Sequence, residues 1–376
     1  MSRIDEMIQQ LCPDGVEYKK LDEVAHVQRG VRVVKKNLSD DEGCPVYQNS
    51  LTPLGYFPKT NEPAGTPFVI GAGAAGEIGY SFEAYWGADD CYSIECGETL
   101  EGRFVYHVLL NQQLKLKSKV RTASIPRLAR TTIEHLEIPI PPLDIQHEVV
   151  RVLDFFTELE AELEAELEAR RMQYAYYSNE LLSRESLETM TGAQVPEVSL
   201  SKLAIIGTGS HDTKDGLAEG AYVFYARGTE PMRLDQWDFD ETAIITAGDG
   251  AGVGKVFHYV EGKYALHQRA YRIVPDNTLL NPRYFFYVMR SRFYEYIMRN
   301  AVQGSVASIR RHMLDNFPVL LPPIPVQQRI VDTLNRFDTL TSSLTDGLPA
   351  EIEARRRQYE FYRDRLLDFP RKEADS

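Results

Sequence analysis

The chain has 376 residues, which is enough for two domains of ordinary size. Its formal net charge is −13 at pH 7. The chain is therefore not one of the nucleic-acid-binding proteins that are basic throughout. The charge is unevenly spread, because residues 143–194 contain 12 acidic and 4 basic residues and so carry more than half of the acidic excess. The rest of the chain is near neutral, so each half can still carry a basic face.

The composition also limits the compartment and the cofactors. No apolar run is long enough to span a membrane, and Met1–Glu6 does not resemble a signal peptide. Cys12, Cys44, Cys91 and Cys96 all lie in the first half and have no cysteine counterparts in the second. We therefore expect reduced thiols in a cytoplasmic protein. The scattered histidines show no metal-ligand spacing, so we expect no metal site.

Residues 1–142 are predicted to form a first module. A short strand pattern is followed by Gly/Pro-rich turns between aromatic and β-branched runs, then by helical spacing over 104–116 and a last short strand before Pro141-Pro142. This pattern favours a mixed α/β module with a curved, largely antiparallel sheet.

Two glycine-rich segments invite a cofactor interpretation. Gly71–Gly76 resembles a dinucleotide or S-adenosylmethionine loop, and we align Ile70–Gly73 with Ile245–Gly248 in the second half. Neither segment is followed by a clear helix start, so tight turns in a sheet explain them better. Adenine methylation also needs an Asn/Asp-Pro-Pro-aromatic motif, and Asn281–Tyr284 lacks the second proline. We predict no cofactor and no catalytic residue in this chain.

Residues 143–190 are predicted to form a long amphipathic helix. One apolar stripe recurs at spacings of three, four and seven: Val149, Leu153, Phe156, Leu163, Leu167, Tyr174, Tyr177 and Leu181. Between Leu159 and Ala169 the sequence Leu-Glu-Ala-Glu recurs in tandem. We interpret the glutamates from Glu158 to Glu168 as a solvated face.

The second half repeats the first about 180 residues later. Residues 191–323 are predicted to form a second module with helical spacing over 282–299, and residues 324–376 a second long helix. Pro322–Gln327 repeats Pro141–Gln146, and Ala354–Tyr359 repeats Ala169–Tyr174. We expect an interruption of the second helix near Gly347 and Pro349. Two copies related by a pseudo-two-fold axis would pair their helices in an antiparallel manner.

These repeated elements resemble the specificity subunit of type I restriction-modification systems. The likeness covers essentially the whole chain and rests on the two double-proline entries, the helices after them, the module ends at 124–136 and 305–317, and the opening Leu11–Tyr18. The resemblance implies an α+β fold with two pseudo-symmetric mixed α/β target-recognition domains separated by two long antiparallel helices. Each domain would read one half of a bipartite, asymmetric site in double-stranded DNA.

The resemblance also implies partners. The helices would dock two methyltransferase subunits that modify adenine N6, and two restriction/translocase subunits would join for cleavage. S-adenosylmethionine, ATP and Mg²⁺ would then be bound by those partners and not by this chain.

Candidate DNA contacts are polar or basic residues in loops that differ between the two copies. In the first module they are Arg32, Lys35, Lys36, Asn49, Lys117, Lys119, Arg121, Ser124 and Arg127. In the second they are Lys214, Arg227, Lys255, Arg269, Arg299, Gln303, Ser305, Arg310 and Arg311.

Two other functions stay open at this point. One is a single-chain methyltransferase, which the missing catalytic motif disfavours. The other is a DNA-binding regulator that assembles without a methyltransferase. Co-purification with methyltransferase subunits would separate the regulator from the specificity subunit.

Overall fold

The computed structural model describes residues 3–122, 124–300, 308–342 and 347–372. The chain divides into two compact units, Met1–Glu164 with Glu351–Ser376, and Ala165–Ala350. The 39-residue helix α6, Leu143–Leu181, contributes to both of them. No helix in the described part of the chain is long and apolar enough to cross a membrane. The same residues contain no group of three or more His, Cys, Asp or Glu that could hold a metal ion.

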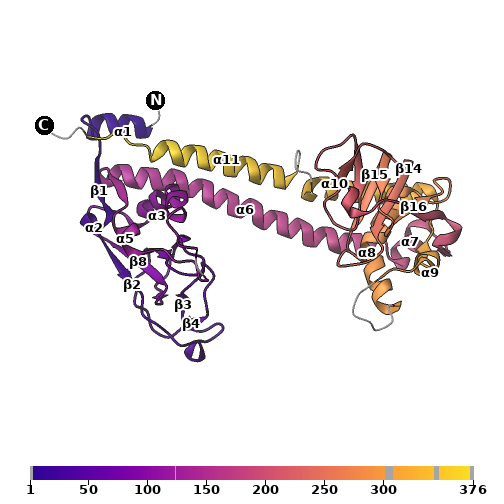
Figure 1. Cartoon of the computed structure of the whole chain (residues 1–376), viewed down its shortest axis with the longest axis horizontal. Coiled ribbons are helices and arrows are strands. Elements are labelled where there is room, and N and C mark those ends of the chain that lie inside the picture. Colours follow the sequence, from indigo (N-terminus) through magenta and orange to yellow (C-terminus); the bar gives the residue numbers. More distant parts are fainter. Residues whose placement is uncertain (1–2, 123, 301–307, 343–346, 373–376) are drawn as a thin grey trace. The chain divides into compact units, whose positions relative to one another are not determined.

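The first unit contains small sheets, short helices and one long C-terminal helix (Figure 1). Its helices are α1 (Arg3–Leu11), α2 (Leu21–Val24), α3 (Gly102–Asn111), α4 (Gln113–Lys117), α5 (Arg130–Glu134), α11 (Leu348–Leu366) and the 3-10 turn η1 (Lys35–Asn37). Its strands are β1 (Glu17–Lys20), β2 (Ala25–Arg29), β3 (Cys44–Tyr47), β4 (Tyr56–Phe57), β5 (Pro67–Ile70), β6 (Ile78–Tyr80), β7 (Trp86–Gly87), β8 (Cys91–Cys96) and β9 (Glu137–Ile140). The central sheet is antiparallel in the order β2-β8-β5-β6.

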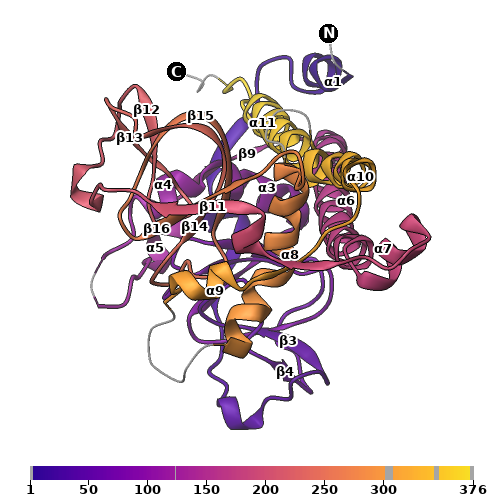
Figure 2. The ribbon, with the colours of Figure 1, turned by 90° about the vertical axis from the view of Figure 1, so that its right-hand side faces the viewer.

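The second unit contains one larger sheet with β12 and β13 at its edge (Figure 2). Its helices are α7 (Arg184–Thr191), α8 (Pro282–Asn300), α9 (Arg311–Asp315), α10 (Ile324–Ser342) and the turns η2 (Leu200–Lys202) and η3 (Thr213–Asp215). Its strands are β10 (Glu197–Ser199), β11 (Ala204–Thr208), β12 (Tyr222–Tyr225), β13 (Met232–Leu234), β14 (Phe239–Ala247), β15 (Phe257–Leu266), β16 (Ala270–Pro275) and β17 (Pro318–Leu320). The order is β11-β16-β14-β15-β12-β13, and only the β12–β15 pair of this sheet is parallel. The predicted mixed α/β modules with largely antiparallel sheets are confirmed.

Helices α3 and α8, which occupy corresponding places in the two modules, each begin with a side-chain cap. Glu101 accepts a hydrogen bond from the Phe104 N–H at 2.5 Å, which fixes the start of α3. Asn281 accepts from the N–H groups of Arg283 and Tyr284 at 2.9 and 3.1 Å at the start of α8. Asn281 is therefore a helix cap, and Pro282 occupies the first turn, where its missing N–H costs nothing.

The long helices pair within each unit. In the first unit Phe156 of α6 stacks on Tyr362 of α11, with ring centroids 5.1 Å apart. In the second unit Tyr177 of α6 stacks on Phe337 of α10 at 5.8 Å. Figure 1 shows α11 beside α6 in the first unit. The predicted antiparallel pairing is confirmed in the first unit, because Phe156 meets Tyr362 whereas Glu160, further along α6, meets Arg356, which lies earlier in α11.

One expectation about α6 is wrong in part. Glu160 and Glu164 are not merely solvated, because the Arg356 guanidinium of α11 forms ion pairs with both carboxylates. Their spacing of four residues puts both on the same face of the helix, so one arginine reaches both.

Candidate DNA interface

A buried glutamine after each double proline attaches the long helix to its module. Gln146 is fully buried, accepts from the Glu101 N–H at 2.9 Å and donates to Thr99 O and Pro141 O at 2.8 and 2.7 Å. Gln327 accepts from the Asn281 N–H at 2.8 Å and donates to Leu279 O and Pro322 O at 3.0 and 2.8 Å. Each module is thus fixed to its long helix by the same three hydrogen bonds.

The glycine segment of the first unit forms a tight loop between β5 and β6. Gly73 and Gly76 have φ of +82° and +86°, which favours glycine at both positions. A Cβ atom at Gly73 would lie 2.9 Å from the Cβ and carbonyl oxygen of Asn49, so there is no space for a side chain. The turn interpretation of this segment agrees with its backbone.

This loop brings several predicted DNA contacts together. Asn49 O accepts from the Ala74 N–H at 2.9 Å, and Arg127 forms backbone bridges with Ala72 and with Arg121. Lys117 lies against Gly76 and pairs with Glu77 at 2.7 Å. Exposed side chains of Asn49, Lys117, Arg121 and Arg127 therefore surround one loop.

The remaining candidates of the first unit are exposed but less closely tied to the loop. Arg32, Lys35 and Lys36 follow Val31, whose N–H donates to Gly87 O at 2.8 Å and so attaches this segment to β7. Lys119 and Ser124 are exposed in the segment between α4 and Arg127.

The second unit has the corresponding loop between β14 and β15. Gly250 and Gly254 have φ of +81° and +69°. Gly248 O accepts from the Ile309 N–H at 2.8 Å, and Gly248 N–H donates to Arg269 O at 2.8 Å. These two bonds match those of Gly71 with Leu128 and Asp90, at 2.8 and 2.7 Å.

Gly248 therefore corresponds to Gly71. The sequence alignment, which set Gly73 opposite Gly248, is wrong by two residues. Several registers superpose glycines in such a segment, and only the sheet hydrogen bonds distinguish them.

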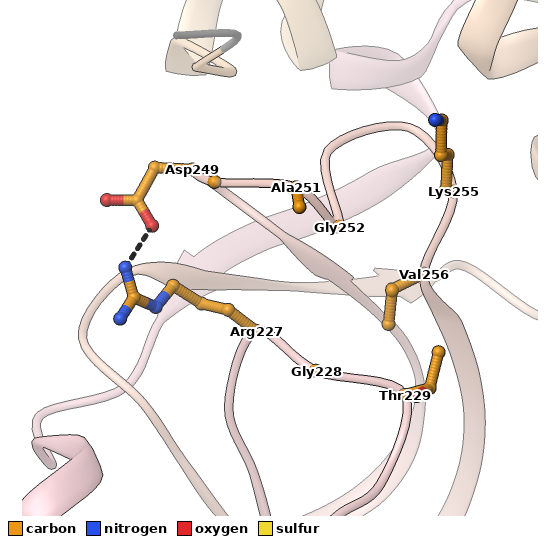
Figure 3. A pocket seen from close by; sticks show the side chains of 9 residues that line it. Arg227, Gly228, Thr229, Asp249, Ala251, Gly252, Lys255 and Val256 are labelled. Carbon is orange, nitrogen blue, oxygen red and sulfur yellow. Dashed lines mark hydrogen bonds and ion pairs between the residues drawn. The ribbon is translucent and has the colours of Figure 1, made fainter. Parts of the chain in front are cut away.

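A pocket of about 600 Å³ opens at this second loop and is lined by Arg227, Gly228, Thr229, Asp249, Gly250, Ala251, Gly252, Lys255 and Val256 (Figure 3). Arg227 and Asp249 point toward one another, with Nη1 and Oδ1 2.8 Å apart. Arg269 binds the other oxygen of Asp249 at 3.0 Å. Burial alone would raise the pKa of Asp249, but hydrogen bonds from the two arginines hold that pKa below its usual range.

Other candidates of the second unit lie near this pocket. Lys255 stands over the Tyr294 ring of α8, 5.5 Å from its centroid. The turn of Lys214 joins the loop of Arg269, because Asp212 caps that turn and accepts from Gln268 at 3.1 Å.

The last candidates differ in how firmly they are held. Arg310 is exposed just before α9, whereas Arg311 donates to Ile206 O at 2.8 Å and pairs with Asp315 at 2.9 Å. Arg299, in the last turn of α8, pairs with Glu295 at 3.4 Å. Gln303 and Ser305 lie outside the described residues.

Asp249 is not among the residues that the sequence pattern predicts, because those are basic, amide or hydroxyl side chains. The sequence around Asp249 gives no sign of the two arginines that bind its carboxylate, because each arginine lies about 20 positions away, one before and one after. The signal that could have found it is the contrast between copies, since the loop of the first unit contains no acidic residue between Gly71 and Gly76.

Both halves of the chain match one known protein family. A family model described as "Type I restriction modification DNA specificity domain" matches residues 13–169 and again residues 196–354. The chain belongs to this family. Both matches contain a module and the start of the helix region that follows it, in agreement with the repeat.

Relatives support the same assignment. A putative type I restriction enzyme specificity subunit of Haemophilus influenzae is 30% identical over 94% of this chain and 96% of its own length. The specificity subunit of an Escherichia coli type I restriction enzyme is 34% identical over 64% of this chain and 65% of its own length. Among solved structures, the type I restriction-modification S subunit from M. genitalium matches with a TM-score of 0.67 over 94% of this chain and 96% of its own. That structure is 16% identical, so the likeness concerns the fold.

Proposed function

We propose that this chain is the specificity subunit of a type I restriction-modification enzyme, in which each unit reads one half of a bipartite, asymmetric site in double-stranded DNA. The observation that carries the proposal is the family match in both halves. It is supported by two loops with the same hydrogen-bonding pattern, each surrounded by exposed polar and basic side chains. Direct readout needs such side chains at base edges, and positioning needs contacts with phosphates.

The proposal places the chemistry in partner subunits. Two methyltransferase subunits would dock on the long helices and transfer a methyl group from S-adenosylmethionine to adenine N6. Two restriction/translocase subunits, which use ATP and Mg²⁺, would join for cleavage. This chain would supply recognition and assembly and would bind none of these cofactors itself.

The proposed DNA contacts of the first unit are Arg32, Lys35, Lys36, Asn49, Lys117, Lys119, Arg121, Ser124 and Arg127. Those of the second unit are Lys214, Arg227, Lys255, Arg269, Arg299, Gln303, Ser305, Arg310 and Arg311. The group around each glycine loop is the best supported of these, because its residues come from segments far apart in the sequence and gather at that loop.

Co-expression with a type I methyltransferase subunit from the same host tests the proposal. We expect a stable complex with two methyltransferase subunits and, by methylome sequencing, adenine methylation at one bipartite sequence. Sequence-specific DNA binding by the chain without any methyltransferase association would instead indicate a regulator.

A further inference from the structure

The two glycine loops present different side chains at corresponding positions. Tyr47 O accepts from the Ala88 N–H at 2.8 Å, and Tyr225 O accepts from the His267 N–H at 3.0 Å. Asn49 and Arg227 each lie two residues after these tyrosines, so they correspond.

The two other positions follow from the bonds of the matched glycines. Because Gly71 and Gly248 correspond, Ala72 in the first unit stands where Asp249 stands in the second. Gly71 N–H donates to Asp90 O and Gly248 N–H donates to Arg269 O, so Asp90 corresponds to Arg269. The first unit therefore has Asn, Ala and Asp where the second has Arg, Asp and Arg.

The Asp249 carboxylate holds both guanidiniums while leaving most of their donors free. Each arginine uses one terminal nitrogen, Nη1, to bind one oxygen of Asp249. A guanidinium has several further N–H donors in a planar fork. The side chains of Arg227 and Arg269 remain 39% and 63% exposed. Arg227 lines the pocket, so its free donors can reach a ligand there, and Arg269 is held beside the pocket by the same carboxylate.

The pocket keeps that approach open. Gly250 and Gly252 contribute no side chains, and a Cβ at Gly252 would lie 2.4 Å from Arg227 O. Glycine at that position thus lets the loop lie directly on the Arg227 backbone. A planar ligand edge can approach the arginines beside bare backbone.

The charge of the cluster favours a base over a phosphate. One carboxylate shared by two arginines offsets half of their positive charge. The attraction of these three side chains for a phosphate is then weaker, because that attraction depends on net charge. The same carboxylate fixes the direction of the remaining donors, and direction is what reading a base edge requires. Guanine offers two acceptors, O6 and N7, that match an arginine fork.

We propose that Asp249 is a positioning residue that orients Arg227 and Arg269 to read a guanine in the half-site of the second unit. This inference rests on the proposed function and adds the base class that this pocket takes. Asn49, at the corresponding position of the first unit, would contact the other half-site.

Charge-preserving variants in the complex with the methyltransferase subunits test the inference. Arg227→Lys and Arg269→Lys keep the charge but lose the fork. We expect at least one of them to lose about 5- to 150-fold of discrimination at one guanine position, with the other half-site unchanged. Asp249→Asn should relax the same position, because the arginines lose their shared anion.

The controls separate a base contact from a phosphate contact. Asp240 is an exposed carboxylate near the start of β14, whereas the loop follows the end of this strand. Asp240→Asn should therefore leave the recognised sequence unchanged. Replacing the guanine by 7-deazaguanine should weaken binding by the wild-type complex and have little further effect on the affected lysine variant.

Two results would overturn the inference while leaving the proposed function intact. One is an unchanged sequence preference in both lysine variants and in Asp249→Asn. The other is a loss of affinity that is uniform across sequences, as for phosphate contacts. A wild-type complex that methylates no bipartite sequence would overturn the proposed function itself.

Discussion

Two buried glutamines make matching hydrogen bonds at the start of the two long helices. Replacing Gln146 or Gln327 by Ala would leave backbone donors and acceptors without partners in a site closed to water. We expect each substitution to lower the free energy of unfolding by about 1–3 kcal/mol. The measurement is urea unfolding of the full chain followed by circular dichroism.

Gln328→Ala is the matched control, because Gln328 is exposed and its side chain bonds those of Asn281 and Asp332, not the backbone groups that the side chain of Gln327 binds. If Gln327→Ala lowered the free energy of unfolding no more than Gln328→Ala does, the role of the buried amide would be contradicted.

His107 makes the stability of the first unit depend on pH. It is fully buried, and burial lowers its pKa although its hydrogen bond to Asp154 at 2.8 Å acts in the opposite direction. A lowered pKa means that the unfolded chain binds a proton more readily than the folded one. Stability should therefore fall as the pH drops below about 6.5, the usual histidine value.

His107→Tyr tests this dependence, because the second unit has Tyr287 at the corresponding position, where its hydroxyl donates to Asn335 at 2.6 Å. Between pH 7 and pH 5 the melting temperature of the variant should fall less than that of the wild-type chain, because a tyrosine takes up no proton in this range when the chain unfolds. Some dependence should persist, because burial also lowers the pKa of His258 and His267. An unchanged profile would contradict the assignment to His107.

The arginines near the module ends should separate into readers of different half-sites. We expect Arg121→Ala or Arg127→Ala to weaken recognition of one half-site and Arg310→Ala that of the other, by about 1–3 kcal/mol for a base contact. Arg311→Ala should also destabilise the second unit, because Arg311 donates to Ile206 O. Binding assays with half-site variants at several salt concentrations measure these effects. Unchanged affinity and preference in all four variants would refute the loop assignment.

The tandem tetrapeptide makes α6 a test of spacing. Removing Leu163–Glu166 shortens the helix by about 6 Å and nearly keeps the phase of its apolar stripe. The deletion also moves Glu168 into the place of Glu164, so the ion pair with Arg356 can form again. The helices that pair with α6 keep their length, so the net shift should be smaller than 6 Å.

We predict that this deletion keeps both half-site sequences and selects a spacer shorter by about one base pair, given a rise of about 3.4 Å per base pair. Methylome sequencing of cells that carry the variant measures both properties. An altered half-site with an unchanged spacer would refute the spacing role.

The whole chain should be catalytically inert without partners. We expect highly purified protein to transfer no methyl group from S-adenosylmethionine to DNA, because it lacks the motif that holds a flipped adenine. A radiolabelled methyl-transfer assay measures this, with the complex that includes the methyltransferase as positive control. Methyl transfer by the chain alone would contradict the division of labour proposed above.

The repeat and the helices could be predicted from the sequence alone. The double prolines, the apolar stripe of α6 and the helical spacing at 104–116 and 282–299 are local signals, because the 3.6-residue period and proline geometry act over a few residues. Comparing two copies within one chain then separated shared framework from differing loops without any other sequence.

The tertiary structure decided how distant segments meet. The true glycine register, the bridge from Arg356 to Glu160 and Glu164, and the pairing of Asp249 with two arginines all join residues from different elements. Strand pairing depends on backbone hydrogen bonds between segments far apart in sequence, and a short polar loop has no period that reveals its neighbours. The sequence thus determined which elements exist and that they occur twice, whereas the fold determined which side chains share a surface.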